Sequence, residues 1–263
     1  MQKILLSLTL LLFVACGPSA ESGSEGAVLP EARTDPAPAP APPNAAKMTP
    51  IFHAAVVLEY DGKTIFIDPY DDPAKFSGFS APDLVLVTHT HQDHFNRDVL
   101  SALDLSKATL VGPAAVTGEA GGMGFAGITT LANGESTAIG NIGVTAVAAY
   151  NLPPAEDAFH PPGKFNGYVV DLGGERYYFS GDTEDVQEMR DLENIDYAFI
   201  CMNLPYTMPM DAAADAVLEF KPRVVYPYHY RNKDGTFMDT EEFARLVREG
   251  DKAIEVRVRD WYK

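Results

Sequence analysis

Short apolar runs separated by polar turn residues fill most of the chain. The runs IFHAAVVLEY (51–60) and KTIFIDPY (63–70) are rich in β-branched and aromatic residues. Asp61-Gly62 between them supports the positive backbone angles of a two-residue turn, so the pair predicts a β-hairpin. The fully apolar run DLVLV (83–87) predicts a short buried strand.

The remaining pattern mixes strands and helices. Helical patterns lie at 95–105, 186–192, 212–220 and 241–249, and strand patterns lie at 108–112, 127–132, 136–140, 142–150, 167–173, 176–182, 197–203, 224–230 and 253–259. The small-residue stretch 114–124 has no clear assignment. Many strands with helices in both halves favour a layered α/β sandwich over a barrel of strict β-α repeats.

The first residues have the composition of a targeting segment. Lys3 supplies one positive charge, residues 4–14 are apolar, and the small Ala15 precedes Cys16. The run LLFVAC (11–16) resembles a bacterial lipobox, in which cleavage leaves the cysteine as the lipidated first residue. An ordinary cleaved signal peptide and an uncleaved apolar anchor are the alternatives.

The lipobox resemblance makes residues 1–16 a lipoprotein signal peptide and places the protein on the periplasmic side of a bacterial cell envelope. Gly17 resembles the pattern that lets lipoproteins continue to the outer membrane. Residues 17–47 are rich in Ala and Pro and predict a disordered tether, because they hold too little apolar surface to fold. Residues 48–263 then form the folded domain.

The composition is strongly acidic, with 37 Asp and Glu against 20 Lys and Arg and a formal net charge of -17. The negative electrostatic field of such a chain repels the phosphate backbone of nucleic acids and argues against a nucleic-acid partner. Bound metal cations, in contrast, favour surrounding carboxylates. With Cys16 used for lipid attachment, Cys201 has no partner for an intramolecular disulfide.

Three of the six histidines stand within the segment THTHQDH (88–94), directly after the predicted strand at 83–87. His89, His91, Asp93 and His94 crowd this one loop. Together they would be costly in apolar surroundings unless their lone pairs were satisfied, and a divalent cation satisfies them. The segment therefore predicts a metal site, with a solvated polar loop as the alternative.

The pattern H-x-H-x-D-H after an apolar strand resembles the signature of the metallo-β-lactamase superfamily. Asp68 in IFIDP, Asp182 in YFSGDT and His229 in YPYHY match further motifs of that superfamily. The resemblance covers 50–263 and implies a four-layer αββα sandwich. The opening hairpin is most similar to the subgroup of ascorbate-6-phosphate lactonases and the phospholipase D acting on N-acyl phosphatidylethanolamines.

The resemblance also implies two divalent metal ions, with zinc fitting the ligand set best and manganese or iron as alternatives. One ion would be held by His89, His91 and His160, the other by Asp93, His94 and His229, with Asp182 shared by both. Asn151 competes with His160, because in some subgroups the third ligand follows the strand immediately. Asp68 would brace the histidine loop from behind.

The implied reaction is hydrolysis of an ester, lactone or phosphodiester by a metal-bridging hydroxide, with a small-molecule or lipid-like substrate. Asp93 and Asp182 are the catalytic candidates, joined by His53 as an acid or base, or as a histidine that is simply packed on a strand. The polar side chains expected near the substrate are Tyr206, Thr207 and Lys164. The alternative is a non-catalytic metal- or partner-binding module on the same fold.

Overall fold

Two stacked β-sheets form the centre of the fold in the computed structural model, which describes residues 45–263. The first sheet has the order β1-β2-β3-β4-β5-β6 and the second β13-β12-β11-β10-β9-β8-β7. The first six strands are β1 (Lys47–Phe52), β2 (Ala55–Tyr60), β3 (Lys63–Ile67), β4 (Leu84–Leu86), β5 (Thr109–Gly112) and β6 (Gly127–Thr130). The others are β7 (Ser136–Ile139), β8 (Ile142–Ala149), β9 (Phe165–Leu172), β10 (Glu175–Phe179), β11 (Tyr197–Cys201), β12 (Val224–Tyr228) and β13 (Glu255–Val256).

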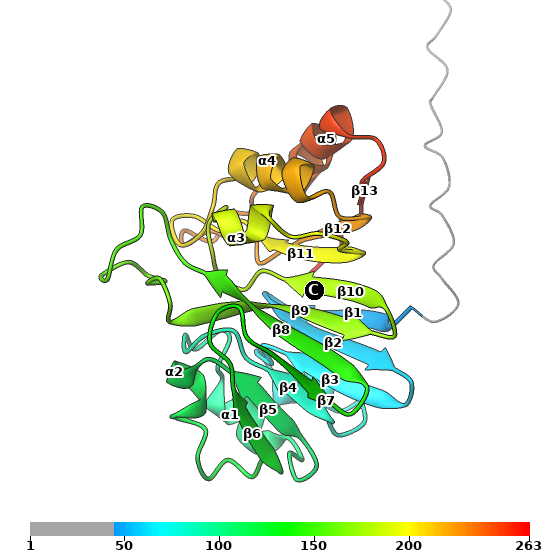
Figure 1. Cartoon of the computed structure of the whole chain (residues 1–263), viewed down its shortest axis with the longest axis vertical. Helices are drawn as coiled ribbons and strands as arrows, with labels where there is room; N and C mark the ends of the chain where they lie inside the picture. The colour runs from blue at the N-terminus through cyan, green and yellow to red at the C-terminus, as the bar shows by residue number, and fades with distance from the viewer. Residues whose placement is uncertain (1–44) are drawn as a thin grey trace, which may run out of the picture. The chain divides into compact units, whose positions relative to one another are not determined.

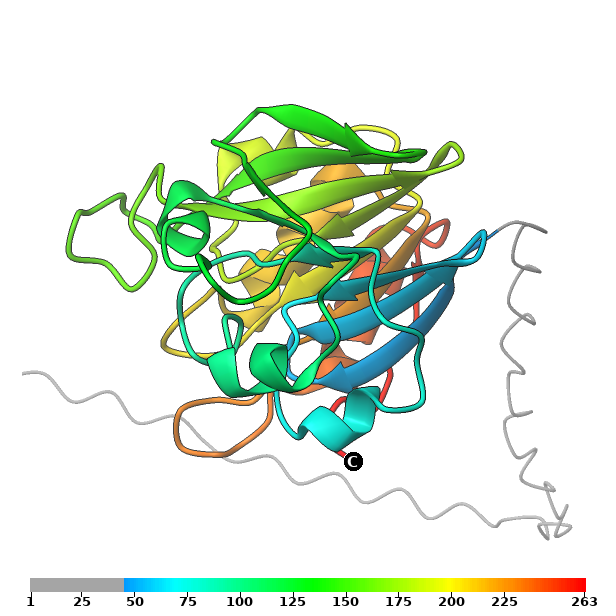
Figure 2. The same ribbon diagram turned by 90° about the horizontal axis from the view of Figure 1, so that it is seen from below.

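Helices cover the outer face of each sheet (Figures 1 and 2). The 3-10 helix η1 (Pro73–Phe76), α1 (Arg97–Ala102) and α2 (Ala114–Thr117) lie on the first sheet, and α3 (Gln187–Arg190), α4 (Met210–Phe220) and α5 (Thr240–Gly250) lie on the second. The layers therefore run helix, sheet, sheet, helix, which confirms the predicted α/β fold with its αββα order.

The inner strands β2 to β5 of the first sheet are buried on both faces, which explains why they are mostly apolar. In β3, Ile65 and Ile67 point into the core between the sheets, whereas Phe66 points into a second core beneath α1 and α2. In β4, Leu84 and Leu86 belong to the first core and Val85 to the second. Because successive side chains of a strand point to opposite faces, each apolar run contributes to the cores on both sides of the sheet.

The predicted hairpin is present, with Asp61 and Gly62 at φ values of 48° and 72° between β2 and β3. The prediction of a single strand at 51–60 was wrong. That stretch contains the end of β1, a turn at His53 and Ala54, and then β2, and the two strands pair antiparallel. His53 adopts a positive φ of 52° to make the turn.

Both sheets contain a block of parallel strands, β3 to β6 in the first and β10 to β13 in the second. The carboxyl ends of parallel strands meet at one edge of a sheet, which is the usual place for a site in such folds. Asp68, the histidine loop 88–94, Asp182 and His229 follow β3, β4, β10 and β12, respectively.

Other predictions fall partly or wholly outside the described residues. The signal peptide and Cys16 lie outside them, as does the tether up to residue 44, while Lys47 at the tether's predicted end is the first residue of β1. The stretch left unassigned at 114–124 begins with α2. No helix within 45–263 is long and apolar enough to cross a membrane.

Candidate metal centre

The loop after β4 brings four predicted ligands to the carboxyl end of the first sheet. The backbone N–H groups of His94 and Phe95 both donate to the carbonyl oxygen of His91, at 3.0 and 2.8 Å, so the chain turns sharply here. Asn96 then caps α1 by accepting from Val99 N at 2.9 Å. The hydrogen-bonded turn thus holds His91 and His94 close together, directly before the helix.

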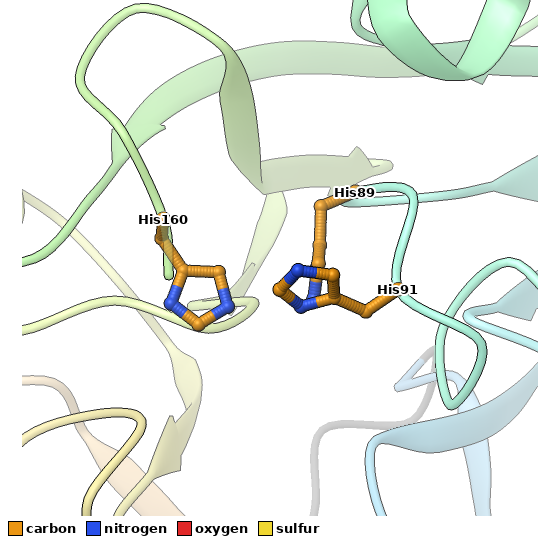
Figure 3. Close-up of side chains that lie close together, drawn as sticks. All are labelled: His89, His91 and His160. Carbon is orange, nitrogen blue, oxygen red and sulfur yellow. The ribbon is translucent and has the colours of Figure 1, made fainter. Parts of the chain in front are cut away.

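The second sheet and its loops supply the remaining candidates. Asp182 follows β10, His229 follows β12, and His160 lies in the loop between β8 and β9. The structure brings all seven predicted ligands together in three overlapping groups, each with its ligand atoms within 4.8 Å of one another: His89, His91 and His160; His89, His94 and Asp182; Asp93, His94 and His229. In Figure 3 the side chains of the first group converge, His89 and His91 from one loop and His160 from the loop opposite.

Buried side-chain nitrogen and oxygen atoms that have no hydrogen-bond partner indicate whether this cluster suits a metal. Seven such side-chain atoms exist among the described residues, and six belong to predicted ligands: Nε2 of His89, His94, His160 and His229, Nδ1 of His229, and Oδ1 of Asp182. A buried polar atom without a hydrogen bond is destabilising and rare. Four imidazole nitrogens and a carboxylate oxygen converging in one place are the donor set that divalent transition metals take, so the residues fit.

Asp68 and Thr88 hold two of the histidines from behind. One Asp68 oxygen accepts from Thr88 N at 2.8 Å, and the other lies 2.7 Å from both Thr88 Oγ1 and His94 Nδ1. Thr88 Oγ1 also lies 2.9 Å from His89 Nδ1. Because both Nδ1 atoms are held in this way, the Nε2 atoms of His89 and His94 are left for the cluster. Asp68 therefore lies where the sequence predicted a bracing residue.

Asn151 holds His160 in a similar way. Its Oδ1 accepts from His160 N at 2.8 Å and lies 3.1 Å from His160 Nδ1, while its Nδ2 donates to Tyr206 O at 2.8 Å. Both the oxygen and the nitrogen of the Asn151 amide are therefore hydrogen-bonded to protein groups. His160 Nε2 is the atom that points into the cluster. Of the two alternatives, the structure places His160 among the other ligands and Asn151 behind it.

The charges within the cluster stabilise one another. Burial favours the neutral acid of Asp182, but the rings of His229 and His94 hold its pKa well below the usual range. Burial disfavours charge on His94, yet Asp182 and Asp68 raise its pKa well above the ordinary value. Burial and the neighbouring His94 lower the pKa of His89. These pKa shifts keep Asp182 ionised, as metal ligation requires, whereas His94 would release its proton when a metal binds.

His53 lies beside the cluster, with its ring centroid 4.4 Å from that of His229. Its Nδ1 lies 2.9 Å from Tyr262 Oη, and Arg231 Nη2 lies 3.0 Å from its Nε2. Because the guanidinium can only donate, Nε2 accepts and Nδ1 donates to the tyrosine. Burial, with His229 and Arg231, lowers the pKa of His53 to about 3. Both ring nitrogens are engaged, which favours a bracing role over the acid or base role.

The cluster opens into a cavity of about 670 Å³. Tyr206 lines it as expected, but Thr207 does not: it is buried, and its hydroxyl donates to Asn203 Oδ1 at 2.8 Å. Lys164 is also absent from the lining and lies 3.9 Å from Glu156. The cations at the cavity are instead Arg231 and Lys233.

The sequence did not indicate Arg231 or Lys233 as cavity residues, whereas the stretch 203–210 was expected to lie over the cleft, and Asn203 lines it. Asn203 follows β11 directly, at the same edge as the other site residues, so its position after a strand was the available signal. Arg231 and Lys233 lie in the loop between β12 and α5, just after the predicted ligand His229.

Residues 47–229 match the family model described as the beta-lactamase superfamily domain. The chain belongs to the beta-lactamase superfamily. Among superfamily relatives, a UPF0173 metal-dependent hydrolase from Pyrococcus abyssi is 34% identical in an alignment of 211 residues that covers 76% of this chain and 91% of the relative. The match to the superfamily model begins with β1 and ends at the predicted ligand His229.

Two solved structures of proteins described as metal hydrolases are also similar to this chain. A protein from Parabacteroides distasonis superposes with a TM-score of 0.73 at 34% identity, covering 82% of this chain and 94% of that protein. Igni18, a metallo hydrolase from Ignicoccus hospitalis, gives a TM-score of 0.70 at 25% identity, covering 83% and 96%.

This beta-lactamase superfamily member is a metal-dependent hydrolase, as its curated relatives are named and as the His and Asp cluster allows. That finding favours the enzyme over the non-catalytic module. The narrower similarity to lactonases and a phospholipase D stays a prediction.

Proposed function

We propose that the protein is a dinuclear hydrolase that acts on an ester, lactone or phosphodiester. Asp182 carries this proposal, because its two oxygens face different groups of histidines. Oδ2 lies 3.6 Å from His160 Nε2, whereas Oδ1 lies 3.3 Å from His94 Nε2 and 3.5 Å from His229 Nε2. A carboxylate in this position can serve two ions at once.

The first and third of the three groups support the division of ligands that the superfamily resemblance implies. His89, His91 and His160 would hold one ion, and Asp93, His94 and His229 the other. Two bound divalent ions would supply an activated water and polarise the oxygen of the scissile bond. The set is rich in imidazole, which supports zinc, although manganese and iron accept such mixed shells too.

The remaining side chains orient this centre. Asp68, Thr88 and Asn151 fix which ring nitrogen of His94, His89 and His160 faces the cluster. Asn203 lines the cavity with its Oδ1 accepting from Thr207, so its amide N–H groups are available to a substrate oxygen.

Elemental analysis and turnover test the proposal together. We expect close to two ions per chain, and chelator-sensitive hydrolysis within a panel of esters, lactones and phosphodiesters. Asp182→Ala should lower both the metal content and turnover more than any other single ligand change, since it removes a ligand from both ions. One ion or none under metal-replete conditions would exclude the dinuclear centre.

We also propose that the hydrolase is exported and held at the envelope by a lipid on Cys16. The run LLFVAC at 11–16 and the Ala- and Pro-rich segment 17–47 support this, because together they have the order of signal, lipidation site and spacer.

A further inference from the structure

Two cationic side chains line the cavity beside the cluster. Arg231 is half-buried and Lys233 is exposed, and neither lies within 4.0 Å of a carboxylate among the described residues. The chain as a whole carries a net charge of -17. The same lining holds the carboxylates of Asp93 and Asp182, so the two cations place positive charge beside these proposed metal ligands.

The loop carrying these cations is fixed to its neighbours. Lys233 N donates to Leu204 O at 3.0 Å, and Leu204 N donates to Asn232 Oδ1 at 2.9 Å. The nearby carboxylate of Asp234 accepts from Thr236 N and Oγ1, at 3.0 and 2.6 Å. Asp234 is therefore used within the loop, and the ammonium group of Lys233 is left to a partner from solution.

Arg231 is held even more firmly. Its guanidinium lies 5.4 Å from the ring centroids of both Phe52 and Tyr262, and Nη2 donates to His53 Nε2. Its backbone N–H donates to Tyr262 Oη at 3.2 Å. The bond to His53 uses one of five N–H donors, so a positioned cation with further donors faces the cavity.

We propose that Arg231 and Lys233 bind an oxyanion of the substrate, a phosphate or a carboxylate, beside the bond that is hydrolysed. This inference rests on the proposed function and narrows it to anionic substrates. The planar guanidinium of Arg231 can donate two parallel hydrogen bonds to an oxyanion, and the ammonium group of Lys233, on a flexible side chain, can donate to it as well. The half-exposed aromatic rings of Phe159 and Phe237 line the same cavity.

Calorimetric titration of the full chain with phenylphosphonate and with benzoate tests the proposal without turnover. Lys233→Gln is the main variant, because its exposed side chain can be neutralised without disturbing the fold. Lys164→Gln is the matched control: it removes the same charge from a residue outside the cavity. Dimethyl phenylphosphonate, the uncharged diester of the first probe, controls for the aromatic ring.

We expect Lys233→Gln to weaken binding of at least one anionic probe by about 10-fold or more, the range for a hydrogen bond to a charged group. Lys164→Gln should stay within about 2-fold of wild type, since exposed charges outside a site contribute little. A loss for phenylphosphonate alone identifies a phosphate site, and a loss for benzoate alone a carboxylate site. Arg231→Lys, which keeps the charge, should weaken the same probe.

Equal affinities in Lys233→Gln and Lys164→Gln, or a neutral diester that binds as tightly as the phosphonate, would overturn the proposal. Titrations of chelator-treated and metal-loaded protein are made side by side. A chain that binds no metal but still loses phosphonate affinity in Lys233→Gln would contradict the dinuclear function and leave the anion site standing, so the two failures are distinguishable.

Discussion

Single hydrogen bonds decide which atoms of this site face a metal, and the pair of Asn151 and His160 shows this best. His160 Nε2 is buried without a partner, whereas both ends of the Asn151 amide are bonded to protein groups. We expect His160→Ala to lose metal from the group with His89 and His91, and to lower turnover at least ~10-fold, as for disturbed metal ligands.

Asn151→Ala should act more mildly, because the ring it supports remains present and only its orientation loosens. Metal content and turnover of the two variants, measured side by side, check this. A larger loss in Asn151→Ala than in His160→Ala would reverse the assignment and make the asparagine the ligand.

At the same scale, local sequence was enough to bring the four candidates of the histidine loop close together, since they lie within six residues, and their role as ligands stays a prediction. Local sequence did not predict which cationic side chains line the cavity. Lys164 is close to His160 in sequence, but it points to Glu156, whereas Arg231 and Lys233 reach the cavity because their loop bonds to Leu204. Such contacts between distant loops depend on the whole fold and leave no local pattern.

At the scale of elements, turn chemistry decided which strands could be predicted. Asp61-Gly62 is a strong hairpin signal, and that hairpin was found. The turn between β1 and β2 uses His53 and Ala54, neither of which favours a turn, so the apolar run across it predicted one strand. His53 is held in this conformation by Tyr262 and Arg231, which lie more than 170 residues away.

Close approach of β9 and β10 gives a prediction at this scale. A Cβ added to Gly167 would lie 2.7 Å from the carbonyl oxygens of Phe179 and Ser180, directly before the site residue Asp182. Backbone oxygens in a sheet cannot move aside easily, so we expect Gly167→Ala to destabilise the fold by at least about 1–3 kcal/mol.

Urea unfolding measures this change. Gly78→Ala is the matched control, because a Cβ there has no heavy atom within 4 Å. It should stay within about 1 kcal/mol of wild type, the size of the effect on the unfolded chain. Unfolding midpoints that agree for the two variants would show that the strands do not pack as closely as described.

For the whole molecule, apolar runs and helical patterns in both halves predicted a layered α/β sandwich, and the resemblance to the metallo-β-lactamase superfamily implied its αββα order. The proposed location depends on residues 1–44, outside the described part. We expect wild-type protein to fractionate with membranes and to incorporate labelled fatty acid, and Cys16→Ser to do neither, because the acceptor thiol is absent. Wild-type protein found wholly in the periplasmic fraction would contradict the lipid anchor.

The last prediction concerns how the site contributes to the stability of the whole domain. Five buried atoms that converge in the cluster, four Nε2 atoms and Asp182 Oδ1, lack partners among the described residues, so the fold bears the cost of burying them unless a cation binds. A ligand that binds only the native state stabilises it by about 4 kcal/mol at 1,000 times its dissociation constant. For a domain of this size that corresponds to a rise in Tm on the order of 10 °C.

Calorimetric melting of chelator-treated protein, with and without added zinc, measures the rise. Asp182→Ala should lose most of it, because the carboxylate between the two groups of histidines is gone. Asp104→Ala, which removes an exposed carboxylate on the loop after α1, should keep it in full. If metal-free and zinc-loaded wild-type protein melted at the same temperature, the convergent nitrogens would have to be satisfied by something other than a metal ion.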